Sequence, residues 1–264
     1  MSPARTNSGA PISLLQRGIA VLGCFGPETR SLTLTEIAEL TKLPLSTTHR
    51  VAGELTKGGF LVRGADKSFH IGTRMWSIAQ YAPVNDQLRL GALPTLARLY
   101  EETGENATLA ILDRGRALYV DRIHGARSVA SVTRAGGYLP LHMTGVGKVL
   151  LAYQSESGIE KYLAKPLTKA TKNTIVDPDL LRSALDEVRQ QGFAVAREEI
   201  SVGTGSVAVP IFVKGDVLVA AVGVVVHLAR MDVPSLVAML QSAAETISRE
   251  IDPVRSIGVR RTQG

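Results

Sequence analysis

The stretch Thr33-Leu-Thr-Glu-Ile-Ala-Glu-Leu-Thr-Lys-Leu-Pro-Leu-Ser-Thr-Thr-His-Arg-Val-Ala-Gly-Glu-Leu-Thr-Lys-Gly-Gly59 predicts two short helices joined by a tight turn. Thr33 and Glu36 have the spacing of a capping box, in which each side chain accepts from the backbone amide of the other, so the first helix begins there. Pro44 suits the first position of the second helix, where no amide donor is needed. Gly58 and Gly59 end that helix.

The second helix has one inward face and one polar outer face. Inward positions follow the helical period and are Thr48, Val51, Ala52 and Leu55. The outer face holds Ser46, Thr47, His49, Arg50 and Gly53. Hydroxyl, imidazole and guanidinium groups suit hydrogen bonding to base edges and phosphates in a major groove. The pattern therefore fits a helix-turn-helix, although an ordinary helical hairpin with a solvated face has the same residues.

The flanking segments complete a small domain. Leu14 to Phe25 predicts a first helix with Leu15 and Ile19 facing inward and Arg17 outside. Two short strands around the turn Arg63 to Lys67 predict a wing, so Arg63 and Lys67 are expected near the phosphate backbone. A further helix from Gly72 to Tyr81 is expected to connect two domains, with Trp76 packed.

Composition narrows the function classes. The 264-residue chain carries a formal net charge of +6, and residues 1 to 81 hold nine Lys and Arg against five Asp and Glu. A basic N-terminal module on a nearly neutral remainder suits phosphate binding. Aromatic content of 5% disfavours base stacking, and the single cysteine, Cys24, excludes a disulfide framework. With no apolar signal-peptide core near the start, a cytoplasmic location is expected.

The remainder of the chain predicts an α+β domain. Helices are expected at its start, middle and end: Leu88 to Thr103, Thr144 to Tyr153, Asp177 to Gln191, and Pro234 to Ile251. Strands are expected at Asn106 to Leu112, Ala117 to Ile123, Val129 to Arg134, Phe193 to Arg197, Ser206 to Phe212 and Val217 to Val226. Because these strands pair through hairpins, the sheet should be largely antiparallel.

Four segments together resemble the IclR family of bacterial transcription regulators, and the likeness covers nearly the whole chain. They are Leu15 to Leu22, Leu43 to Arg50, Leu139 to Ala152, and Gly192 to Phe212. The resemblance implies a winged helix-turn-helix, a linker helix and a GAF-like α/β effector-binding domain with a curved antiparallel sheet. It also implies a homodimer or homotetramer on double-stranded operator DNA, a small organic-acid effector, and control of a catabolic operon, for example as a repressor.

The resemblance also implies where the effector lies. Helix N-termini attract carboxylates, so the helix starting near Thr144 should hold one. The expected effector site comprises Leu139, Leu141, Met143, Thr144, Gly145, Val146, Leu150, Ala196, Ser206, Gly223 and Val225. Family members that bind small keto acids have an acidic residue in place of Ala196 and serines in place of Gly223 and Val225. We therefore expect a larger, more apolar pocket and an aromatic or longer acid, or a related amide, rather than glyoxylate or pyruvate.

Motifs for phosphate binding, nucleophilic catalysis and metal binding match the sequence less well. Gly145 to Lys148 lacks the spacing and the following Ser or Thr of a phosphate loop. A triad of Ser206, His142 and Asp121 lacks a nucleophile elbow, so no catalytic residues and no cofactor are expected. No histidine has a helical metal partner, although a metal assembled from distant loops near His124 and His142 stays open. Two other classes of function remain, namely a constitutive DNA-binding oligomer without an effector and an enzyme that uses the pocket of the second domain.

These expectations give a domain plan. Residues 1–12 form a disordered tail, 13–72 the winged helix-turn-helix, 73–83 the linker helix, 84–252 the effector domain and 253–264 a basic tail. The DNA-contacting set is Arg17, Ser46, Thr47, His49, Arg50, Arg63 and Lys67.

Overall fold

A computed structural model of the chain describes residues 13–26, 29–125, 128–129, 133–213 and 216–251. It divides into two compact units between Ala82 and Pro83, called here the N-terminal and C-terminal units. The tails predicted over residues 1–12 and 253–264 lie outside the described residues. Within the described part, no helix is both long and apolar enough to cross a membrane.

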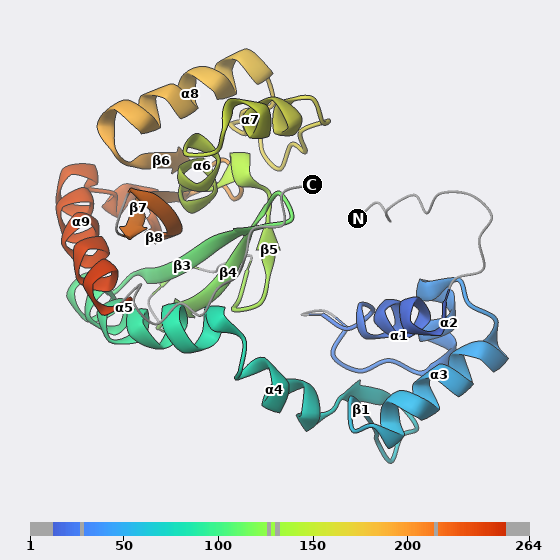
Figure 1. Cartoon of the computed structure of the whole chain (residues 1–264). Coiled ribbons are helices and arrows are strands. Elements are labelled where there is room, and N and C mark those ends of the chain that lie inside the picture. The colour runs from blue at the N-terminus through green and yellow to red at the C-terminus, as the bar shows by residue number, and fades with distance from the viewer. Residues whose placement is uncertain (1–12, 27–28, 126–127, 130–132, 214–215, 252–264) are drawn as a thin grey trace. The chain divides into compact units, whose positions relative to one another are not determined.

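The N-terminal unit is a three-helix arrangement followed by a two-stranded hairpin and a short helix (Figure 1). Its elements are α1 (Leu14–Leu22), α2 (Leu34–Thr41), α3 (Leu45–Lys57), β1 (Leu61–Arg63), β2 (Phe69–Ile71) and α4 (Thr73–Ala79). The two strands pair antiparallel, with Leu61 opposite Ile71. This order confirms the predicted winged helix-turn-helix.

A small core holds the N-terminal unit together. Val21, Ile37, Val51 and Leu61 are at most 2% exposed, and Phe69 of the wing is 5% exposed and packs with them. Helix, turn and wing therefore share one core, and the wing is fixed against the helices by Phe69.

Three apolar side chains of this unit do not lie where the sequence placed them. Leu15 and Ile19 of α1 are 73% and 60% exposed, because α1 ends at Leu22 and contributes Val21 to the core instead. Trp76 of α4 is 69% exposed rather than packed. These residues form apolar surface within the N-terminal unit.

The C-terminal unit is a six-stranded sheet with helices on both faces. Its helices are α5 (Leu90–Thr103), α6 (Gly145–Ala152), α7 (Glu156–Leu163), α8 (Pro178–Gln191) and α9 (Val233–Glu250), with short helical turns η1 (Val84–Arg89), η2 (Leu141–Met143) and η3 (Leu228–Arg230). Its strands are β3 (Asn106–Asp113), β4 (Arg116–Ile123), β5 (Tyr138–Leu139), β6 (Ala194–Arg197), β7 (Thr204–Val213) and β8 (Val217–His227).

All neighbouring strands of the sheet are antiparallel, in the order β5-β4-β3-β8-β7-β6, which confirms the predicted antiparallel sheet. Successive side chains of β8 point to opposite faces of the sheet. Val222 and Val224 pack with α5 and α9, whereas Ala221 packs with α6 and α8. Because both faces are covered, β8 reads as a continuous apolar run.

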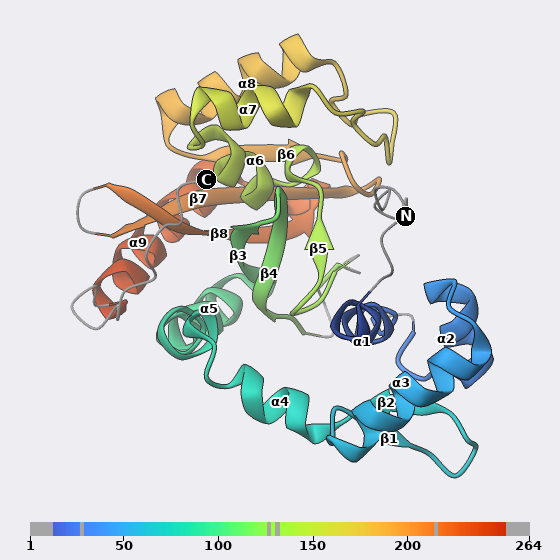
Figure 2. The same cartoon turned by 45° about the vertical axis from the view of Figure 1, so that its right-hand side comes forward.

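Helices α6, α7 and α8 lie on one side of the sheet. Figure 2 shows α7 and α8 lying beside each other over α6. The strand predicted at Val129 to Arg134 is not assigned in the part of it that the structure describes, and residues 130–132 lie outside the description. The strand that pairs with β4 is instead β5, which follows the Gly136-Gly137 turn.

Candidate functional site

The turn between α2 and α3 is built by local hydrogen bonds. The Thr33 amide donates to Glu36 Oε2 at 2.7 Å, and the Glu36 amide donates to Thr33 Oγ1 at 3.3 Å, so the predicted capping box is confirmed. The Thr33 amide also holds the pKa of the Glu36 carboxyl below its usual range. Lys42 ends α2 with φ 57°, a left-handed conformation that turns the chain sharply into Pro44, the N-cap of α3.

The outer face of α3 is polar and accessible. Ser46, His49 and Arg50 are exposed and Thr47 is half-buried. Thr48, Val51 and Ala52 are buried, as the helical period predicts, and the Thr48 hydroxyl donates to the Pro44 carbonyl at 3.1 Å. The exposed side chains are thus free to meet a partner, and their contact with DNA stays a prediction.

The wing presents its two basic residues to solvent. Arg63 and Lys67 are exposed. The Arg63 guanidinium lies 5.6 Å from the centre of the Phe69 ring, and Lys67 has φ 66° at the tip of the turn. Asp66 accepts from the Ser68 hydroxyl at 2.6 Å, which holds the pKa of Asp66 down and fixes the turn.

Arg17 differs from the other predicted DNA contacts. It is half-buried rather than fully outside, and its Nε has no hydrogen-bond partner among the described residues. The sequence placed it outside because the face of α1 was assigned from Leu15 and Ile19, which are themselves exposed.

The C-terminal unit contains a cavity between the sheet and the start of α6. The space between its lining atoms measures about 590 Å³, including the part open to solvent. Nine of the residues expected from the sequence line it: Leu139, Met143, Thr144, Gly145, Val146, Ala196, Ser206, Gly223 and Val225. Their contact with an effector stays a prediction.

Leu141 and Leu150 do not line this cavity. They are each 1% exposed and pack in the core that joins α6 to α8 and the sheet. Leu141 lies in the η2 turn before α6, and Leu150 lies on α6 away from the helix start, so both support the cavity wall from behind.

The start of α6 is packed tightly and leaves one amide free. The Gly145 amide donates to Ser206 Oγ at 3.0 Å, and the Gly147 amide donates to Thr144 Oγ1 at 3.0 Å. No described residue accepts from the Val146 amide. A Cβ at Gly147 would lie 2.3 Å from the Leu141 carbonyl oxygen, so only glycine fits there. The free amide and the helix dipole favour a bound anion.

Gly223 does not enlarge the cavity as expected. A Cβ there would lie 2.8 Å from the Val207 carbonyl oxygen and 3.0 Å from Val146 Cγ1. The space that a side chain would take is therefore filled by α6 and β7, and Gly223 lets α6 approach the sheet. Ala196 and Val225 do keep their part of the wall apolar.

The sequence did not predict all the residues that line the cavity. The additional residues are Thr108, Tyr119, Thr133, Glu198, Glu199, Ile200, Ser201, Thr204, Gly205, Val207 and Val224. Tyr119 is 3% exposed, and burial raises the pKa of its hydroxyl to about 12, so it is a neutral donor at physiological pH. The alternating apolar pattern of β3 and β4 gave no signal for the residues that face the cavity.

The segment between β6 and β7 forms one wall and is held from two sides. Glu198 adopts φ 55°, and its carbonyl accepts from the Thr171 hydroxyl at 2.6 Å. The Thr174 hydroxyl donates to the Glu199 carbonyl at 2.6 Å. Lys148 Nζ of α6 meets Glu199 Oε1 at 2.5 Å, and both side chains are buried. Burial raises the pKa of Glu199, and Lys148 opposes that shift.

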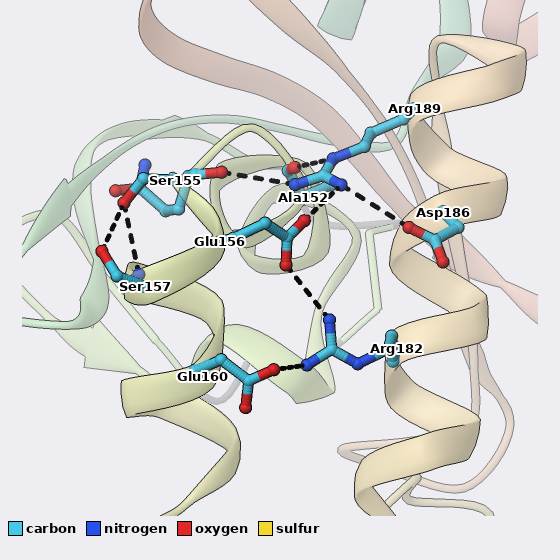
Figure 3. Close-up of polar contacts among 10 residues, drawn as sticks. Ala152, Ser155, Glu156, Ser157, Glu160, Arg182, Asp186 and Arg189 are labelled. Carbon is cyan, nitrogen blue, oxygen red and sulfur yellow. Dashed lines mark hydrogen bonds and ion pairs between the residues drawn. The ribbon is translucent and has the colours of Figure 1, made fainter.

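The far end of α6 is anchored by α8. Arg189 donates through Nε to the Ala152 carbonyl at 2.5 Å and pairs with Glu156 of α7 at 3.1 Å (Figure 3). Arg182 bridges Glu156 and Glu160 of α7 in the same view. Cations favour a helix C-terminus, so Arg189 caps α6 while tying α7 to α8.

The three residues of the weighed triad are engaged separately. His142 contacts the Tyr162 hydroxyl through Nδ1 at 2.7 Å and the Thr168 carbonyl through Nε2 at 2.9 Å, while Asp121 pairs with Arg89 at 2.8 Å. Ser206 Oγ accepts from Gly145. Among the described residues, no three His, Cys, Asp or Glu side chains cluster in a way that could hold a metal ion.

Comparison with known proteins matches both units. Residues 82–249 match the family model of the bacterial transcriptional regulator IclR C-terminal domain, and residues 14–65 match the IclR helix-turn-helix domain. The Escherichia coli (strain K12) transcriptional repressor IclR is 32% identical over 206 residues, covering 76% of this chain and 75% of the repressor. The Pca regulon regulatory protein of Pseudomonas putida is 30% identical over 219 residues, covering 82% of this chain and 75% of that protein.

Solved structures agree. An IclR homologue from Microbacterium hydrocarbonoxydans, complexed with 4-hydroxybenzoate, has a TM-score of 0.87 at 32% identity, covering 90% of this chain and 99% of that one. A transcriptional regulator from Rhodococcus sp. RHA1 has a TM-score of 0.78 at 28% identity, covering 90% of this chain and 97% of its own.

Proposed function

This chain belongs to the IclR family of bacterial transcriptional regulators, and we propose that an aromatic or similarly apolar carboxylic acid bound beside α6 controls its binding to an operator. It is a regulator with a helix-turn-helix and an effector-binding domain, and not an enzyme. One observation carries the proposal: the unbonded Val146 amide at the start of α6 lies in the wall of a cavity whose other walls are largely apolar.

The DNA half of the proposal rests on α3 and the wing. Ser46, Thr47, His49 and Arg50 would read bases or adjoining phosphates, as a recognition helix does. Arg63 and Lys67 would contact the backbone, and Arg17, being half-buried, would do so only with its guanidinium tip. A basic N-terminal unit supports the phosphate contacts.

The effector half rests on the walls of the cavity. Leu139, Met143, Ala196 and Val225 supply apolar surface, whereas hydroxyl and amide donors concentrate at the start of α6. A ligand with one anionic end and an apolar body matches both features. The 4-hydroxybenzoate complex of the Microbacterium homologue supports this class, and benzoate-type acids should bind more tightly than glyoxylate or pyruvate.

Self-association is part of the proposal. Leu15 and Ile19 of α1 and Trp76 of α4 are 60 to 73% exposed. A second copy that covers them would form a homodimer or homotetramer, as paired half-sites on an operator require. An effector would then shift the population of assemblies whose head spacing suits the operator, provided that it binds those assemblies with a different affinity. The protein would act in the cytoplasm on a catabolic promoter.

A gel shift tests the proposal directly. The full-length protein is mixed with the DNA immediately upstream of its own gene, with and without benzoate, 4-hydroxybenzoate, glyoxylate and pyruvate. A specific shift that an aromatic acid alters supports both halves. A specific shift that no acid alters supports the constitutive DNA-binding oligomer instead, and the absence of any specific shift contradicts the DNA half.

A further inference from the structure

A β-bulge decides which side chains of β4 face the cavity. In the pairing of β3 with β4, Leu109 lies opposite Asp121 but Ala110 lies opposite Tyr119, so Val120 is the extra residue. Bulges re-aim the side chains that follow them. Without the bulge, Tyr119 and Arg122 would point to opposite faces, because they are three residues apart. With it, Tyr119 lines the cavity and Arg122 lies opposite Thr108, another lining residue.

The described partners of the Arg122 guanidinium are neutral. Its Nη1 donates to the Thr133 carbonyl at 2.7 Å, and Thr133 lines the cavity. Its Nη2 donates to Asn106 Oδ1 at 2.9 Å, and Asn106 is fully buried. Its Nε is buried and has no hydrogen-bond partner among the described residues. Burial lowers the pKa of this guanidinium, which nevertheless stays charged.

The sequence that follows Arg122 supplies no carboxylate to balance its charge. Between Arg122 and Leu139 the sequence contains no Asp or Glu, and it adds Arg127 and Arg134. The neighbouring Asp121 accepts from the backbone amide of Arg122 at 2.7 Å and pairs with Arg89 at 2.8 Å, so its carboxylate is bound to groups other than the Arg122 guanidinium. Within the described residues no carboxylate pairs with Arg122, and a half-buried charge without a partner is costly.

We infer that Arg122 supplies the positive charge that balances the effector's carboxylate, so that the cavity selects a carboxylic acid over its neutral amide. The inference rests on the proposed function and names a residue that directs its specificity. Arg122 attracts the carboxylate electrostatically and holds Thr133 of the cavity wall in place, and it does not contact the effector directly. The direct donors remain Val146, Tyr119 and Ser206.

The other charges around the cavity do not balance the negative charge of a bound carboxylate. The lining contains two carboxylates, Glu198 and Glu199, and Lys148 neutralises one of them. A helix N-terminus contributes only about half an elementary charge. Without Arg122, a bound carboxylate would face net negative surroundings, and its affinity would fall to that of an uncharged isostere.

Isothermal titration on the full-length protein tests the inference, with 4-hydroxybenzoate and 4-hydroxybenzamide as matched probes. The wild type should bind the acid more tightly than the amide. Arg122→Gln should weaken acid binding roughly tenfold, as expected for one charge acting at an effective dielectric constant near 20, and should change amide binding less than twofold. Arg122→Lys should retain most of the acid preference.

A control variant separates charge from position. Arg116→Gln removes the same charge from an exposed residue of β4 whose guanidinium contacts the carbonyl and the ring of Tyr138, which does not line the cavity, so it should leave both affinities unchanged. Equal weakening of acid and amide in Arg122→Gln, or no weakening of the acid, overturns the inference but leaves the proposed function standing. A wild type that binds the amide as tightly as the acid overturns it without any variant. A wild type that binds neither refutes the proposed effector class, and the role of Arg122 with it.

Discussion

Gly223→Ala should destabilise the C-terminal unit by overpacking the contact between α6 and the sheet. The added Cβ would lie 2.8 Å from the Val207 carbonyl oxygen, 3.0 Å from Val146 Cγ1 and 3.0 Å from Ala208 Cβ. Two of these neighbours belong to the backbone or Cβ of β7, which cannot swing aside like the tip of a long side chain. The start of α6 must therefore move away from β8.

The magnitude follows from the cost of adding a methyl group to a packed core, which is about 1–3 kcal/mol. For a unit of this size, each kcal/mol lowers Tm by roughly 2–4 °C, so the expected loss is about 2–12 °C. Near-ultraviolet circular dichroism during thermal unfolding measures it, because five of the six tyrosines lie in the C-terminal unit. Gly18→Ala is the control, since a Cβ there meets nothing within 4 Å.

A double-mutant cycle identifies the clash. Val146→Ala removes Cγ1, one of the three atoms that the new Cβ would meet, so part of the cost of Gly223→Ala should disappear in its presence. The coupling energy should be about 1 kcal/mol, since residues in direct contact are not additive. Strict additivity, or a Gly223→Ala variant that melts with the wild type, would show that Gly223 does not hold α6 against the sheet.

Three further predictions concern the recognition helix, pH and the anchor of α6. Arg50→Ala should weaken operator binding by about 1–3 kcal/mol in a gel shift if the side chain contacts a base, and an unchanged affinity would remove Arg50 from the reading face. Burial lowers the pKa of His142 below 6.5, so the unfolded chain takes up the proton first and stability present above pH 6.5 is lost as the pH falls. Thermal melts of the wild type and His142→Asn at pH 7.5 and 5.5 should show this loss only in the wild type. Arg189→Gln should cost about 1.5 kcal/mol through the lost Ala152 bond, whereas Arg182→Gln, which breaks only ion pairs to exposed carboxylates, should cost under about 1 kcal/mol. Equal losses would argue against the capping role.

The recognition region could be predicted because its determinants are local. The capping box at Thr33 and Glu36 and the Gly58 stop act within a few residues, and both are found in the structure, whereas Pro44 is the N-cap of α3, one position before the predicted one. The antiparallel sheet could also be predicted from the sequence, because short hairpin turns join its strands. Arg114 and Gly115 form one such turn, and both adopt the positive φ that it requires. Local signals therefore predict most elements of this chain, although they missed β5.

The burial of individual side chains depends on contacts with elements that are distant in the sequence, and a local pattern does not predict those contacts. The period of α1 allows either of two faces inward, and the structure buries Val21 while leaving Leu15 73% exposed. Leu141 and Leu150 share the segment of the cavity residues, but the one-turn helix η2 and the direction of α6 point them into the core. Which face of a helix is buried depends on where the other elements of the same unit pack against it.

The cavity chemistry depends on an even smaller feature. Val120 is one unpaired residue in a strand of eight, and nothing in its sequence marks it as a bulge. Yet its insertion brings the phenol of Tyr119 and the guanidinium of Arg122 to the same face of β4. A regular strand with the same sequence would place Arg122 on the face covered by α5 and α9, where a charge would be buried in an apolar core. The bulge and the charge therefore fit each other: the bend at Val120 keeps Arg122 out of the apolar core and places it opposite Thr108, a residue of the cavity wall.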